Sequence, residues 1–176
     1  MKMAYNTDEV LVSHDEIEQM LDRVSVEINR DYRDQPLVVV GILTGAFIFM
    51  ADLVRRLNMP VTIDFMQVSS YEGDSSTGIL KIKKDISSDI RDKNVLVVED
   101  VVDTGRTLSH LKEMLLERGP KSLKICTAFD KPSRRVTDMV PDYNGIEVPD
   151  EFIVGYGLDL DGQFRDFNDV RIVRKE

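Results

Sequence analysis

The sequence predicts an α/β fold built on a central, mostly parallel β-sheet that is flanked by helices. Two continuous runs of apolar, largely β-branched residues, Leu37–Leu43 and Val95–Val98, are typical of strands that are buried on both faces of a sheet. Each run is followed by a short turn and then by apolar residues at helical spacing. This alternation favours parallel strands that are joined by crossover helices.

The N-terminal part is expected to contain two helices and two strands. Ser13 and Glu16 match a capping box, in which the serine caps the helix and the glutamate reaches back to it. Helical spacing then continues to about Tyr32 through Ile17, Met20, Leu21, Val24 and Ile28. The segments that follow are a strand at 37–43, a turn at 44–46, a helix at 47–57 and a strand at 61–67.

After the strand at 61–67, the alternation of predicted strands and helices is interrupted. Segment 69–78 is rich in Gly, Ser and Thr, which predicts a long surface loop of the kind that is often functional. After the strand at 95–98, a helix runs to Glu117, where Gly119 and Pro120 stop it. Two further β-type runs follow, at 121–129 and 152–156.

The length, composition and net charge predict one acidic globular domain that spans residues 1–176. The net charge of -9 argues against nonspecific binding to nucleic acid or to an anionic membrane, because both need a basic surface. The only cysteine, Cys126, excludes an internal disulfide and is expected to pack as a small apolar side chain. We find no secretory leader and no apolar stretch that could span a bilayer, so we expect a cytoplasmic protein.

The most informative stretch for chemistry is 95–107. Glu99 and Asp100 end a buried strand, Asp103 follows them, and Thr104–Thr107 opens a helix. Ligands of open α/β sheets bind at the carboxyl ends of strands, where a helix N-terminus offers N–H groups that suit a phosphate. The acids would repel a phosphate, but they could accept hydrogen bonds from vicinal sugar hydroxyls, directly or through a metal. The pattern therefore predicts a sugar-phosphate site.

Residues Val97–Leu108 resemble the phosphoribosyl-pyrophosphate motif of the type I phosphoribosyltransferases. More narrowly, from about Val10 to Val173, the chain is similar to the bacterial hypoxanthine-guanine phosphoribosyltransferases of purine salvage. The resemblance implies a core at about 36–145, with a small hood from about 1–15 and 146–176. It also implies a Mg²⁺-dependent enzyme that joins hypoxanthine or guanine to the 5-phosphoribosyl group of phosphoribosyl pyrophosphate, giving IMP or GMP. A homodimer or homotetramer is implied as well.

The resemblance also assigns roles to matching positions. The phosphoribosyl group would be bound by Glu99, Asp100, Asp103, Thr104, Gly105, Arg106 and Thr107. Pyrophosphate would be bound by Thr44, Gly45 and Arg165, although the family often has a basic residue in place of Thr44, and often a cis peptide in this loop. The purine would contact Lys131, Phe152 and the backbone of Ile153. Magnesium would be bound by Glu99, Asp100 and Asp159, and Ser70 and Tyr71 would form the tip of a closing loop.

Asp103 is the candidate general base for the proton on purine N7, and Glu99 and Asp100 supply like charge nearby in the sequence. One alternative is a transcription regulator on the same fold that senses phosphoribosyl pyrophosphate, which would need a basic nucleic-acid face or an added winged helix. A phospho-receiver domain would need acids after its first strand, and the strand at 37–43 lacks them. Among enzymes, adenine and pyrimidine transferases are further alternatives, but the spacing of Lys131 and Phe152 favours 6-oxopurines.

Overall fold

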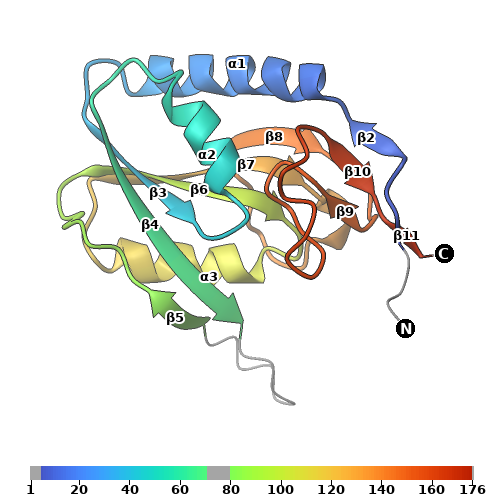
Figure 1. Ribbon diagram of the computed structural model, residues 1–176. Helices are drawn as coiled ribbons and strands as arrows, with labels where there is room; N and C mark the ends of the chain where they lie inside the picture. Colours follow the sequence, from blue (N-terminus) through green and yellow to red (C-terminus); the bar gives the residue numbers. More distant parts are fainter. Residues whose placement is uncertain (1–4, 71–79, 176) are drawn as a thin grey trace.

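A six-stranded central sheet organises the computed structural model, which describes residues 5–70 and 80–175 (Figure 1). The strand order is β5-β4-β3-β6-β7-β8, and every neighbouring pair is parallel except β4 and β5. The strands are Leu80–Lys84 (β5), Val61–Ser70 (β4), Leu37–Ile42 (β3), Asn94–Val102 (β6), Ser122–Asp130 (β7) and Tyr143–Glu147 (β8). The predicted fold class is therefore confirmed.

Helices cover both faces of this sheet (Figure 1). Helices α1 (His14–Asp31) and α2 (Phe47–Val54) lie on one face, and α3 (Arg106–Leu116) lies on the other. Within β3, Val39 packs into the core that contains the α1 and α2 residues, whereas Val38 and Val40 pack into the core that contains α3. Burial on both faces explains why this strand is continuously apolar instead of alternating.

Helix α1 forms as its sequence predicts. The Glu16 backbone N–H donates to Ser13 Oγ at 3.3 Å, and the Ser13 backbone N–H donates to Glu16 Oε2 at 2.8 Å, which completes the capping box. The predicted apolar residues are all buried: Ile17, Met20, Leu21, Val24 and Ile28. Tyr32 caps the C-terminal end, where the prediction placed it.

Two small sheets bring the two ends of the chain together beside the central sheet (Figure 1). One has the strand order β2-β10-β9, with strands Val10–Val12, Val170–Ile172 and Ile153–Val154. The other pairs Tyr5–Asn6 (β1) with Arg174–Lys175 (β11). The run predicted as a strand at 152–156 thus contains only a two-residue strand, which lies outside the central sheet.

Several element boundaries differ from the sequence prediction. Strand β6 continues to Val102 because it stays paired with β7 as far as Asp130, so Glu99 and Asp100 lie within the strand. Ser69 and Ser70 were predicted to start a loop, but they belong to β4 and pair with β5. Helix α2 ends at Val54 and is shorter than predicted.

The sequence prediction also missed strands β5 and β8, which form the two edges of the central sheet. Both contain charged or polar residues in place of a continuous apolar run, because an edge strand has less surface to bury. Cys126 is fully buried in the core, as predicted. No helix in the described part of the chain is long and apolar enough to cross a membrane.

Candidate active site

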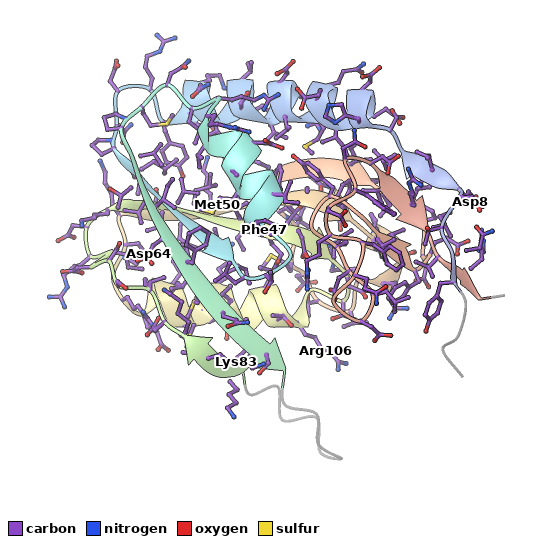
Figure 2. All side chains as sticks on the ribbon, in the orientation of Figure 1. Asp8, Phe47, Met50, Asp64, Lys83 and Arg106 are labelled. Carbon is purple, nitrogen blue, oxygen red and sulfur yellow. The ribbon has the colours of Figure 1, made fainter. Side chains whose placement is uncertain are left out.

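The candidate site lies where β6 leads into α3, at the carboxyl edge of the central sheet. A cavity of about 160 Å³ is lined by Glu99, Asp100, Val101, Val102, Asp103, Thr104, Gly105, Thr107 and Leu108. The predicted phosphoribosyl-binding residues all line this cavity except Arg106, which is exposed at the start of α3. Figure 2 shows Arg106 there, with Phe47 at the start of α2 on the opposite face of the sheet.

Glycine at position 105 suits the tight turn before α3. Gly105 has φ of +83° and precedes the first helical residue, Arg106. A Cβ at this position would lie 2.4 Å from Thr137 Oγ1, so a side chain would be excluded by space as well as by backbone conformation. The first turn of a helix carries N–H groups without intrahelical acceptors, and here that turn borders the cavity. An anion could be bound at this point.

Glu99 and Asp100 form a close, partly buried pair of carboxylates at one side of this cavity. Burial, and then the neighbouring Asp100 carboxylate, raise the pKa of Glu99 well above its usual value. Burial also raises the pKa of Asp100, although its Oδ1 accepts a hydrogen bond from the Val101 backbone N–H at 2.7 Å. Such a pair would be stabilised by a cation or by hydroxyl donors.

The loop between β3 and α2 reaches this acid pair. A Cβ built on Gly45 would lie 1.6 Å from Asp100 Oδ2, so only glycine fits between the loop and the carboxylate. Gly45 is buried, whereas Thr44 is exposed. The peptide bond between Leu43 and Thr44 is cis, which the sequence left open.

The C-terminal segment packs against the same loop. A Cβ on Gly157 would lie 2.1 Å from the Gly45 carbonyl oxygen, so these two glycines bring the segments into contact. Arg165 donates to the Gly157 carbonyl at 2.5 Å and forms an ion pair with Asp159 at 2.8 Å. Arg165 also opposes part of the pKa increase that burial causes at Asp100. The predicted pyrophosphate arginine therefore lies near the acid pair.

The predicted purine residues lie on two neighbouring segments. Lys131 follows β7, and its Nζ donates to the Glu151 carbonyl at 2.7 Å. Phe152, which directly follows Glu151, is 53% exposed. Its carbonyl accepts from the Val173 backbone N–H at 2.8 Å, and Ile153 is buried in β9. Phe152 is thus available to stack on a ligand instead of serving the core.

The side chain of Asp103 has a partner that the sequence did not suggest. The sequence places Glu99 and Asp100 near it, but its side chain is paired with Arg134. Arg134 also donates to Asp150 at 3.2 Å. Sequence reasoning missed both Arg134 and Asp150, because the arginine is 31 positions from Asp103 and belongs to no recognisable local pattern.

The remaining predictions concern the closing loop and the metal. Ser70 is the last residue of β4, and Tyr71 lies outside the described residues. Asp159 is engaged with Arg165 and also accepts from the Gly162 backbone N–H at 2.8 Å. Over residues 5–70 and 80–175, no group of three or more His, Cys, Asp or Glu side chains is arranged to hold a metal ion.

Comparison with known proteins identifies similar chains over nearly the full length. The model of a family described as "Phosphoribosyl transferase domain" matches residues 9–161. A hypoxanthine phosphoribosyltransferase of Salmonella typhimurium is 47% identical over 163 residues, which cover 91% of this chain and 92% of that protein. A hypoxanthine-guanine phosphoribosyltransferase of Streptococcus pneumoniae is 42% identical over 168 residues, which cover 95% of this chain and 93% of that protein.

A crystal structure of a hypoxanthine-guanine phosphoribosyltransferase from Bacillus anthracis is also similar to this chain. It has a TM-score of 0.93 and 40% sequence identity, covering 98% of this chain and 100% of that one. These relatives carry the names of enzymes, which favours a transferase over the regulatory alternative.

Proposed function

Because this chain belongs to the phosphoribosyl transferase domain family, we propose that it transfers the 5-phosphoribosyl group of phosphoribosyl pyrophosphate to hypoxanthine or guanine. The products are IMP or GMP and pyrophosphate, in a reaction of purine salvage. The observation that carries the proposal is the contact between Gly45 and Asp100, which puts the candidate loop for the leaving group directly against the candidate acids for the sugar.

The reaction breaks the bond between C1 of the ribose and pyrophosphate, and forms a bond between C1 and a purine nitrogen. Positive charge develops on the sugar and negative charge on the leaving group. Thr104, together with the first turn of α3 that includes Thr107, holds the 5-phosphate at the cavity. Glu99 and Asp100 accept hydrogen bonds from the ribose hydroxyls, and their negative charge faces the sugar as it becomes cationic.

The leaving group is received by the loop at Thr44 and Gly45 together with Arg165. Arg165 is held by Asp159 and by the Gly157 carbonyl, so its guanidinium is fixed before the substrate arrives. Preorganised donors of this kind stabilise the charge that develops in the transition state. The contact between Gly157 and Gly45 supports placing the arginine and the loop on the same leaving group.

The residues present fit a magnesium ion. Glu99 and Asp100 offer adjacent carboxylate oxygens whose mutual repulsion a divalent cation would relieve. Mg²⁺ takes one or two carboxylates and keeps several waters, so a sparse donor set is expected, with Asp159 contributing through water. When bound, the ion would supply charge neutralisation for pyrophosphate and a template that joins it to the ribose hydroxyls.

The purine is bound between Phe152 and Lys131. Phe152 stacks on the ring, the Ile153 backbone contacts its edge, and Lys131 donates to the 6-oxo group. Lys131 has three donors, so it can keep its bond to the Glu151 carbonyl while it binds the base. Asp103 accepts the proton from N7 as the new bond forms.

The small sheets belong to a hood from about 1–15 and 146–176, next to a core at about 36–145 within a single domain, and the structure describes 5–15 and 146–175 of this hood. Their position beside the carboxyl edge of the central sheet supports this division (Figure 1). The chain assembles as a homodimer or homotetramer, for which the exposed apolar side chains of Phe47 (41%) and Ile63 (51%) offer a surface.

One assay tests the proposed function. The protein is mixed with phosphoribosyl pyrophosphate, Mg²⁺ and either hypoxanthine, guanine, xanthine or adenine, and the ultraviolet spectrum is followed. We expect conversion of hypoxanthine or guanine that stops when a chelator removes the metal. Failure to convert any 6-oxopurine would contradict the proposal, and conversion of adenine alone would move the chain to another substrate class.

A further inference from the structure

The candidate base Asp103 is held through only one of its two oxygens. Arg134 Nε donates to Asp103 Oδ1. Over residues 5–70 and 80–175, no hydrogen bond to Asp103 Oδ2 is present, and both side chains are a little under half exposed. One oxygen is therefore anchored, and the other is available to a ligand.

The other end of the Arg134 guanidinium is attached to a different segment. Its Nη1 lies 3.2 Å from Asp150 Oδ1 and 3.5 Å from Asp150 Oδ2. Asp150 directly precedes Glu151, which accepts from Lys131, and Phe152, which is the candidate stacking residue. Arg134 thus bridges the loop that bears the candidate base and the loop that bears the purine contacts.

Bonds from Arg135 and Val136 hold the backbone around Asp103 but leave its side chain free to rotate. Arg135 is paired with the buried Asp130, and its Nε donates to the backbone carbonyl of Asp103 at 3.3 Å. The Val136 backbone N–H donates to the carbonyl of residue 104 at 3.0 Å. These bonds fix the backbone at Asp103, so the freedom that is left is rotation of its side chain, and Arg134 restricts that rotation.

We propose that Arg134 is a positioning residue, which holds Oδ1 of Asp103 so that Oδ2 faces N7 of the bound purine. This inference rests on the proposed function, because it assumes that Asp103 accepts a proton from the base. A general base must lie within hydrogen-bond reach of the proton it takes, and a carboxylate that rotates freely spends less time there. The fork of a guanidinium can bind two acids at once, which a lysine could not do with the same geometry.

The test compares Arg134→Gln with a matched control, Arg118→Gln. Arg118 also forms an exposed ion pair with a carboxylate, Asp85, through two bonds of 2.8 and 2.9 Å, but it lies away from the site. We expect Arg134→Gln to lower kcat about ten- to a hundredfold, the usual scale for a misplaced catalytic group, and to leave KM for phosphoribosyl pyrophosphate within about twofold. Arg118→Gln should keep wild-type turnover. Both variants should melt within about 3 °C of the wild type, because exposed ion pairs contribute little to stability.

A second comparison asks whether Arg134 acts through Asp103. In an Asp103→Asn background, Arg134→Gln should cause no further loss, since residues that act as a unit are not additive. An equal loss in both backgrounds, or wild-type turnover of Arg134→Gln, would overturn the positioning role while leaving the proposed function intact. A wild-type protein that converts no purine would refute the proposed function itself.

Discussion

Replacing Gly45 with alanine should damage the site through one steric clash. The new Cβ would lie 1.6 Å from Asp100 Oδ2, 2.6 Å from its Cγ and 3.3 Å from its Cβ. Asp100 cannot rotate away without losing the bond between its Oδ1 and the Val101 backbone N–H. Either the carboxylate or the loop must therefore move by about 1 Å or more, a displacement that can cost about a hundredfold in rate.

We expect Gly45→Ala to lower kcat/KM for phosphoribosyl pyrophosphate by about a hundredfold. Its stability should fall by about 1–3 kcal/mol, as for overpacking elsewhere, which corresponds to several degrees in Tm. Steady-state kinetics and thermal unfolding measure the two effects. A kcat/KM within about twofold of the wild type would refute the steric argument, because it would mean that Asp100 does not need its present position.

Gly119→Ala provides the matched control. Gly119 has φ of +72°, and an added Cβ would meet only Arg91 Cγ, at 3.8 Å. Alanine there is strained by about 1–3 kcal/mol, which is similar to the expected cost at Gly45, but it touches no candidate site residue. This variant should melt earlier and keep its kcat/KM, which separates loss of stability from loss of the site.

Three further predictions concern the base, the purine contact and acid stability. Asp103→Asn should lower kcat by about a hundredfold or more in steady-state kinetics, and wild-type turnover would end the proton-transfer role. Lys131→Ala should weaken binding of hypoxanthine and guanine in calorimetry, and unchanged affinity would contradict its assignment. Hydrogen bonds from Lys124 and Tyr143 lower the pKa of Asp31 to about 2, so its stabilisation is complete above the unfolded-state value near 3.8 and is lost as pH falls through about 2. Asp31→Asn should therefore cost about 1 kcal/mol in urea unfolding at pH 7 and almost nothing near pH 2, whereas a pH-independent cost would refute the linkage.

The phosphoribosyl part of the site could be predicted because its residues are consecutive. Glu99 to Thr107 run from the end of a buried strand into a helix, and local geometry alone brings most of them to one cavity. The same local rules predicted α1 with its capping box and the strands β3 and β6. These elements follow from dihedral preferences and from the spacing of apolar residues, both of which act over a few positions.

Other features depend on segments that are distant in the sequence. The contact of Gly45 with Asp100 requires that β3 and β6 be adjacent and in register, as the pairing of Leu37 with Asn94 shows. No periodicity indicated that Phe152 would be exposed, since an isolated phenylalanine in an apolar run ordinarily enters the core.

By itself, therefore, the sequence determined the α/β class, the buried strands of the sheet and the continuous motif that suits a sugar phosphate. Only the tertiary structure decided that Arg134 is the partner of Asp103, and that Gly157, whose carbonyl accepts from Arg165, meets the loop at Gly45. The physical reason is that backbone preferences are set by neighbouring residues. Contacts between distant side chains depend instead on strand order, register and the packing of the crossover segments.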